Sequence, residues 1–148
     1  MMDNIWTCEV GGLRASRIVG VPYRTLDGWV REGVLPETAT PAQGKGTKRG
    51  FSLADLVRAR VVGHLRGAGV SMQQIRKVLV ELENRWGIAE ALLQGGRLVV
   101  AGEKLFWAFD DKALLDVLTG QLAARSLVIL PVGEMIAETR EALLLACA

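Results

Sequence analysis

Residues 22–35 have the sequence Pro-Tyr-Arg-Thr-Leu-Asp-Gly-Trp-Val-Arg-Glu-Gly-Val-Leu, the most informative stretch of the first half of the chain. Its apolar positions recur at the three- and four-residue spacing of a buried helical stripe, namely Leu26, Trp29 and Val30. A proline at the first turn and Gly33 after the last one are typical of helix boundaries. The stretch therefore predicts a short helix with one apolar and one cationic side, as found in ordinary surface helices and in helices that read DNA.

A second short helix is expected immediately upstream. Residues 13–19 are followed by Gly20 and Val21, so two helices would be joined by a tight turn. This spacing is that of a helix-turn-helix motif. In that motif the first helix braces the second against the DNA backbone, and side chains near the start of the second helix reach base edges in the major groove. Arg24 occupies such a position.

The segment downstream, residues 36–50, lacks periodicity and is rich in proline and glycine. It carries three cations, Lys45, Lys48 and Arg49. A flexible solvated connector would have the same composition, but its place after a recognition helix indicates a wing. Such a loop can follow a phosphate backbone or place an arginine in the minor groove.

Another helix pair is predicted after the loop. Ser52 and Asp55 resemble a capping box that opens a helix through about Gly67, whose apolar positions are Leu53, Leu56, Val57, Val61 and Leu65. A further helix opens near Ser71. Its apolar stripe alternates steps of three and four and comprises Met72, Ile75, Leu79, Leu82 and Trp86. We interpret Met72 and Ile75 as core residues. Leu82 and Trp86 could equally contact a partner subunit.

Residues 13–80 resemble the winged helix-turn-helix DNA-binding domain of MerR-type transcriptional regulators. The motifs that carry the resemblance are Gly20-Val21, Arg24-Thr25-Leu26 with Trp29, Arg31-Glu32-Gly33, Arg49-Gly50-Phe51-Ser52, Leu65-Arg66 and Gly69-Val70-Ser71-Met72 with Ile75. The resemblance implies a dimer that binds double-stranded DNA at a pseudo-palindromic operator. The expected DNA-contacting residues are Arg14, Arg17, Tyr23, Arg24, Asp27, Arg31, Lys45, Lys48 and Arg49.

The chain departs from the family pattern at Asp27 and Gly28, where many members have an arginine and an aromatic residue. Asp27 could orient Arg24 or Arg31, or accept a hydrogen bond from a cytosine amino group. We favour a local salt bridge, because a carboxylate close to phosphates is otherwise repelled.

The formal charge of +2 conceals an asymmetry between the two halves of the 148-residue chain. Residues 1–80 carry 12 Lys and Arg against 6 Asp and Glu, whereas residues 81–148 carry 6 against 10. A basic half that meets a polyanion and an acidic half that does not would produce this pattern. The chain has no apolar run of bilayer-spanning length and no signal-peptide pattern at its start, so we expect a soluble cytoplasmic protein without membrane contact.

Catalytic and metal chemistry find little support in the sequence. The two cysteines, Cys8 and Cys147, lie at opposite ends of the chain, so we expect neither a disulfide framework nor a cysteine-rich metal sensor. His64 is the sole histidine and lies on a charged helix, where a solvated side chain is expected. We find no nucleophile–base pair, carboxylate dyad or phosphate-binding loop, and so predict no enzyme, no metal and no cofactor.

The second half has a different pattern. Residues 97–101 and 104–109 flank Gly102-Glu103 and predict a β-hairpin. A helix from Asp110 or Asp111 to about Leu118 should follow, with Leu114, Leu115 and Leu118 facing inward. A strand at 126–132 and a helix from about Gly133 complete the order, with Met135 or Ile136, Ala142, Leu143 and Leu144 buried. Three aromatic residues could line an effector pocket, although we favour two in the core and one at an interface: Phe106, Trp107 and Phe109.

The fold class expected is α+β, with a DNA-binding domain at 1–80 and a small α+β unit for dimerisation, interaction or effector binding at 81–148. The function expected is that of a homodimeric, sequence-specific transcriptional regulator. One alternative is an antitoxin or a phage or plasmid control protein whose C-terminal unit binds a protein partner, as the apolar residues 142–146 would permit. Another is a DNA-binding module gated by a small molecule. The operator and the direction of regulation do not follow from the sequence.

Overall fold

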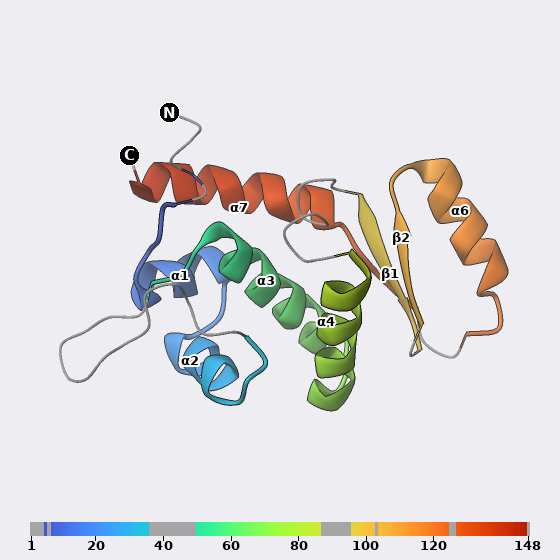
Figure 1. Ribbon diagram of the computed structural model, residues 1–148, viewed down its shortest axis with the longest axis horizontal. Coiled ribbons are helices and arrows are strands. Elements are labelled where there is room, and N and C mark those ends of the chain that lie inside the picture. Colours follow the sequence, from blue (N-terminus) through green and yellow to red (C-terminus); the bar gives the residue numbers. More distant parts are fainter. Residues whose placement is uncertain are drawn as a thin grey trace. The chain divides into compact units, whose positions relative to one another are not determined.

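The computed structural model describes residues 5, 7–35, 50–86, 96–102, 104–124 and 127–147 (Figure 1). The chain divides into two compact units. The first comprises residues 1–63 together with 137–148, and the second comprises residues 64–136. The mixed α+β class expected from the sequence is confirmed, because the described residues form both helices and a three-stranded antiparallel sheet.

The first unit begins with the predicted helix pair, α1 (Gly12–Val19) and α2 (Tyr23–Arg31). Gly20 ends α1 in the left-handed region at φ 83°, which a residue without a Cβ adopts without strain. The Ser16 hydroxyl donates to the Val21 carbonyl and further ties the turn to α1. Pro22 directly precedes α2, and Gly33 has φ 77° after its last turn. Each boundary agrees with the sequence prediction.

Helix α3 (Leu53–Gly67) follows the loop segment, which lies outside the described residues. The capping box is present: the Ser52 amide donates to the Asp55 carboxylate at 3.0 Å, and the Asp55 amide donates to the Ser52 hydroxyl at 3.3 Å. Just before α3, Phe51 forms an isolated antiparallel bridge with Val10. This bridge joins the end of the predicted wing to the residues that precede α1.

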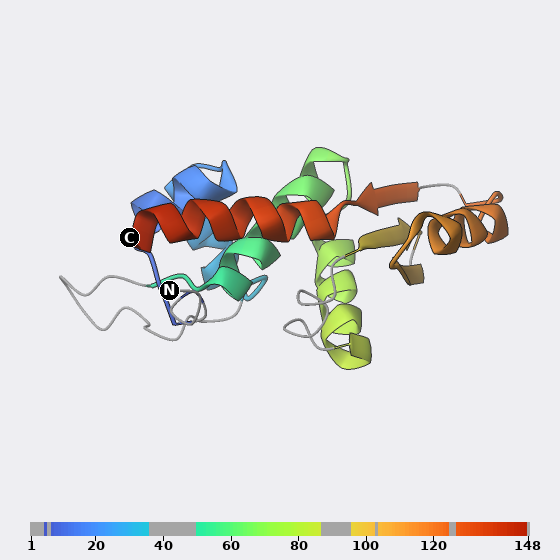
Figure 2. The ribbon, with the colours of Figure 1, turned by 90° about the horizontal axis from the view of Figure 1, so that it is seen from above.

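The first unit is completed by the C-terminal part of α7 (Val132–Cys147), which lies beside α1 in both ribbon views (Figure 2). Thr139 and Leu143 are fully buried, and the predicted Leu144 is 38% exposed instead. At the end of the helix Cys147 is joined to Cys8 by a disulfide. We expected no disulfide framework because the two cysteines lie at opposite ends of the sequence. The single bond shows that distance along the sequence is no guide once α7 returns to the first unit.

The second unit holds α4 (Met72–Trp86), a three-stranded sheet and α6 (Asp111–Gly120). The predicted hairpin is confirmed as β1 (Arg97–Ala101) and β2 (Lys104–Ala108), with Val99 opposite Phe106. Strand β3 (Leu127–Leu130) pairs antiparallel with the other side of β1, so the sheet order is β2-β1-β3. Pro131 follows β3, where a residue without an amide hydrogen suits the end of a strand.

Helix α6 begins as predicted, because the Asp110 side chain accepts a 2.7 Å hydrogen bond from the Ala113 amide. Its burial pattern differs from the expectation. Leu115 is 63% exposed, and no residue of α6 is fully buried. The helix packs against β2, and Leu114 and Leu118 are partly covered whereas Leu115 is not.

Candidate nucleic-acid interface

Helix α2 is oriented by its apolar stripe. Leu26, Trp29 and Val30 are buried, as predicted, and Trp29 is only 8% exposed. Its ring lies over α3 at Gly63, where an added methyl group would stand 3.7 Å from the Trp29 Cη2 atom. The stripe thus fixes which side of α2 faces outward.

The outward side of α2 carries Arg24, Asp27 and Arg31 at steps of three and four residues, so the three share one face. Asp27 accepts from the Arg31 Nε at 2.9 Å, which confirms the local salt bridge favoured from the sequence. The exposed Arg24 has neither an ion-pair nor a hydrogen-bond partner among the described residues. Because the carboxylate is engaged by Arg31, Arg24 remains as an available donor on this face.

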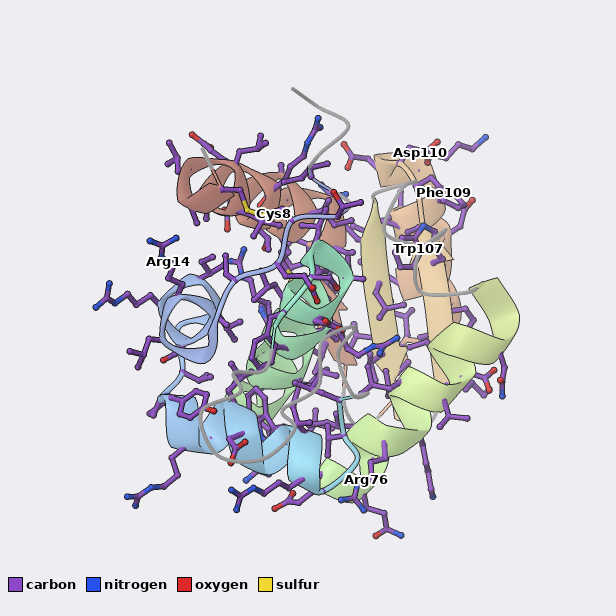
Figure 3. The ribbon with its side chains drawn as sticks, turned by 60° about the vertical axis from the view of Figure 1, so that its left-hand side comes forward. Cys8, Arg14, Arg76, Trp107, Phe109 and Asp110 are labelled. Atoms are coloured by element: carbon purple, nitrogen blue, oxygen red, sulfur yellow. A yellow bond between two sulfur atoms is a disulfide. The ribbon has the colours of Figure 1, made fainter. Side chains whose placement is uncertain are left out.

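Helix α1 presents Arg14 and Arg17 three residues apart, and both are exposed. Figure 3 shows Arg14 on α1. Tyr23, at the start of α2, is also exposed at one edge, although its ring lies against Gly12 so closely that a Cβ there would overlap it. Tyr23 therefore links the two helices. The sequence prediction assigned it to DNA contact and missed Gly12, whose small size was the available signal.

Both helices begin without a side-chain cap in the described part of the chain, and neither has an acidic residue in its first turn. The amides at the start of a helix have no partner within it and carry partial positive charge. Such a start is suited to a phosphate. Helix α6 of the second unit differs, because Asp110 caps it and Asp111 lies in its first turn.

Three predicted contact residues, Lys45, Lys48 and Arg49, lie outside the described residues. The structure does locate the end of their segment, since Phe51 exchanges two hydrogen bonds with Val10, at 2.8 and 3.0 Å. The remaining six predicted residues, Arg14, Arg17, Tyr23, Arg24, Asp27 and Arg31, all belong to α1 and α2 of the first unit.

Two contacts of the C-terminal helix were not foreseen. Arg14 donates through Nη1 to the Ala146 carbonyl at 2.9 Å. Arg60 of α3 donates to the Thr139 hydroxyl at 2.9 Å and to the Glu138 carboxylate at 2.8 Å. No local sequence pattern predicts these contacts, because their partners are 78 to 132 residues apart in the sequence.

The second unit contains a hollow of about 430 Å³. Phe109 lines it, together with Arg97, Asp110, Asp111 and Glu134. The Asp111 carboxylate accepts a 2.7 Å hydrogen bond from Arg97 and thereby raises the pKa of that guanidinium. Trp107 meets Phe109 edge to face at 6.1 Å, and Phe106 is partly buried. The lining carries charged groups of both signs, and among the described residues Arg97 and Asp111 form an ion pair within it.

Comparison with known proteins agrees with this geometry. Residues 14–82 match the family of MerR helix-turn-helix regulatory proteins. The helix-turn-helix of this chain is thus of the MerR type. Relatives named as HTH-type transcriptional regulators in Mycobacterium bovis and Mycobacterium tuberculosis share 28% identity over 109 residues, which is 74% of this chain and 47% of theirs. The chain thus spans about half the length of these relatives.

The match to the MerR family covers most of α1, all of α2, the segment of the predicted wing, α3, and most of α4. It therefore includes every residue predicted to contact DNA, from Arg14 to Arg49. None of the described helices is long and apolar enough to cross a bilayer.

Proposed function

We propose that this MerR-type protein is a sequence-specific transcriptional regulator that binds double-stranded DNA in the cytoplasm. The observation that carries the proposal is the outer surface of α1 and α2. Arg24 lies at the uncapped start of α2, Arg17 lies in the last turn of α1, and neither has an ion-pair or hydrogen-bond partner among the described residues. Arginine at the start of a recognition helix can bond a guanine edge, and helix starts and cations bind phosphate.

The two arginines have different roles in this proposal. Arg24 lies in the first turn of α2, the part of a recognition helix that enters the major groove. Arg17 lies in the last turn of α1, the helix that crosses the backbone, and would contact phosphate together with Arg14. Lys45, Lys48 and Arg49 would extend the phosphate contact as a wing.

We further propose that the protein acts as a homodimer on a pseudo-palindromic operator. A single helix-turn-helix domain reads one half-site, and linking two copies raises affinity because the second contact becomes intramolecular. Strand β3 supports a dimer: among the described residues it pairs only with β1, and Leu127 and Ile129 are 43% and 37% exposed. An apolar sheet edge of this kind is suited to pairing with a second copy.

Selection of bound duplexes from random DNA, followed by footprinting on the selected sequence, tests the proposal. A regulator of this kind should yield one sequence with two related halves, and protection should cover both. If no sequence is enriched over the starting pool, sequence-specific binding is excluded.

The alternative of a DNA-binding antitoxin or phage or plasmid control protein is favoured by one observation, the exposure of Leu145 to 76% at the end of α7. In that case the adjacent gene would encode a small toxin-like partner, whereas a regulator would adjoin a divergent promoter. The alternative of a small-molecule-gated module would use the hollow beside Phe109. Binding of DNA that depends on an added small molecule would distinguish it.

A further inference from the structure

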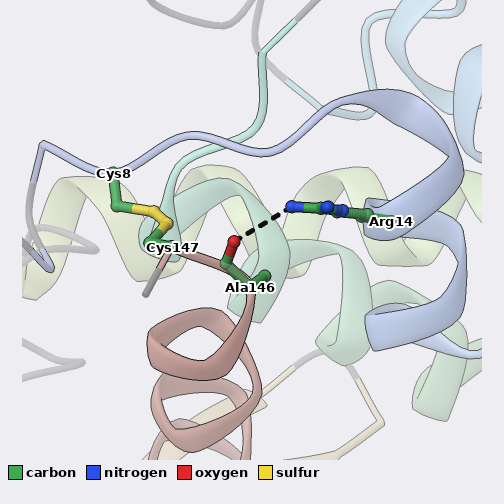
Figure 4. The surroundings of a disulfide bond; sticks show 4 residues. All are labelled: Cys8, Arg14, Ala146 and Cys147. Carbon is green, nitrogen blue, oxygen red and sulfur yellow. Dashed lines mark hydrogen bonds between the residues drawn. A yellow bond between two sulfur atoms is a disulfide. The ribbon is translucent and has the colours of Figure 1, made fainter.

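The two cysteines of the chain come together although they are 139 positions apart. Their Cα atoms are 6.4 Å apart, within the range that a disulfide bridges, and both belong to the first unit (Figure 4). Cys8 is partly exposed and Cys147 is exposed. A small thiol or disulfide in solution can therefore reach the pair.

The bond joins two functionally different segments. Cys8 immediately precedes the bridge between Val10 and Phe51 and the start of α1, whereas Cys147 is the last residue of α7. Beside the bond, Arg14 donates to the carbonyl of Ala146 (Figure 4). That carbonyl is one of the unsatisfied acceptors at the negative end of a helix. A guanidinium expected to contact DNA phosphate is thus engaged by the chain itself.

The rest of α7 is anchored independently of the disulfide. Arg60 holds Glu138 and Thr139, and Leu143 is fully buried. Beyond Leu143 the side chains of the last turn are largely exposed. Without the covalent bond this last turn has little to resist fraying, which is usual at helix ends. Opening the disulfide should therefore release the last turn and leave the remainder of α7 in place.

We propose that Cys8 and Cys147 form a reversible thiol–disulfide site whose oxidised state holds the last turn of α7 on α1 and keeps Arg14 from DNA. The DNA-binding part of this inference rests on the proposed function. Cytoplasmic thiols are ordinarily reduced, so the bond would form under oxidation. Arg14 would then be released in the reduced state and engaged in the oxidised state.

The chemistry is exchange with a low-molecular-weight disulfide such as glutathione disulfide. The exposed Cys147 thiolate attacks one sulfur of that disulfide, forms a mixed disulfide and expels one glutathione thiolate. The Cys8 thiolate then attacks the Cys147 sulfur and expels the second. The protein loses two electrons and two protons, and the oxidant becomes two thiols.

The test compares the full chain after treatment with glutathione disulfide and after reduction with dithiothreitol. Hydrogen exchange followed by mass spectrometry should show slower exchange of the last turn of α7 in the oxidised form, with no change around Leu143. The double variant C8S/C147S should exchange alike under both conditions. Two results would refute the proposal that the disulfide holds the last turn of α7. One is disulfides between chains in place of the internal bond, and the other is equal hydrogen exchange of the last turn in both states.

DNA affinity is then measured on a duplex carrying the selected operator. Oxidation should weaken binding by up to about tenfold, the effect of one charge-assisted contact, and should make the salt dependence shallower. The Arg14→Ala variant should keep the disulfide but lose the redox dependence of affinity. Equal affinity of both states in the unmodified chain would refute control of DNA binding. If neither state binds selected DNA, the proposed function fails, and hydrogen exchange still decides the tether.

Discussion

Replacement of Trp29 by alanine should destabilise the first unit strongly. A tryptophan exposes roughly 250 Å² in an extended chain, so an exposed fraction of 8% corresponds to about 230 Å² buried. Alanine would still bury about 60 Å², leaving a loss near 170 Å², and at about 25 cal/mol per Å² this amounts to about 4 kcal/mol. Measured substitutions of this kind fall in the same range, about 3 to 5 kcal/mol.

The measurement is denaturation of the full chain followed by circular dichroism. A loss of about 4 kcal/mol is a large share of the usual stability of a domain and should lower the melting temperature by about 12 °C or more. Leu13→Ala is the matched control, because Leu13 is 71% exposed on α1 and its loss should change stability by less than about 0.5 kcal/mol. If Trp29→Ala has the same melting temperature as the unmodified chain and loses only DNA binding, Trp29 faces DNA, and α2 is rotated about its axis relative to the orientation described above.

Three further predictions concern DNA contact, turn geometry and assembly. Arg24→Ala should weaken binding to the selected operator by about 1 to 3 kcal/mol and relax the preference at one base pair. Lys48→Ala should instead weaken binding to all sequences alike and reduce the slope of affinity against salt concentration by roughly one. Equal losses of affinity for operator and random DNA in Arg24→Ala would contradict its role. Gly102→Ala should lower the free energy of unfolding by about 1 to 2 kcal/mol, because alanine is strained at a φ of 62°. In denaturant titration Gly96→Ala should lower it clearly more, because its Cβ would also lie 2.7 Å from the Ala108 carbonyl oxygen. Ile129→Lys should convert a dimer to a monomer in light scattering if the β3 edge holds the dimer, and an unchanged mass would place the dimer contact elsewhere.

The sequence alone determined the elements whose boundaries depend on neighbouring residues. The turn at Gly20, the cap formed by Ser52 and Asp55, and the hairpin around Gly102 each follow from interactions within a few positions, so pattern and spacing were sufficient. The same applies to the salt bridge between Asp27 and Arg31, one helical turn apart. These local features also placed the candidate DNA-contacting face of α2.

The features that join distant segments depend on how the whole chain packs. The tertiary structure returns α7 to the first unit, pairs Cys8 with Cys147 and directs Arg14 to the Ala146 carbonyl. It also leaves Leu115 exposed, because a helical period predicts which residues share a face but not how wide a contact the neighbouring sheet provides. Such pairings depend on where a whole helix packs. For α7 that position depends on buried side chains such as Leu143, and no short-range pattern in the sequence indicates it.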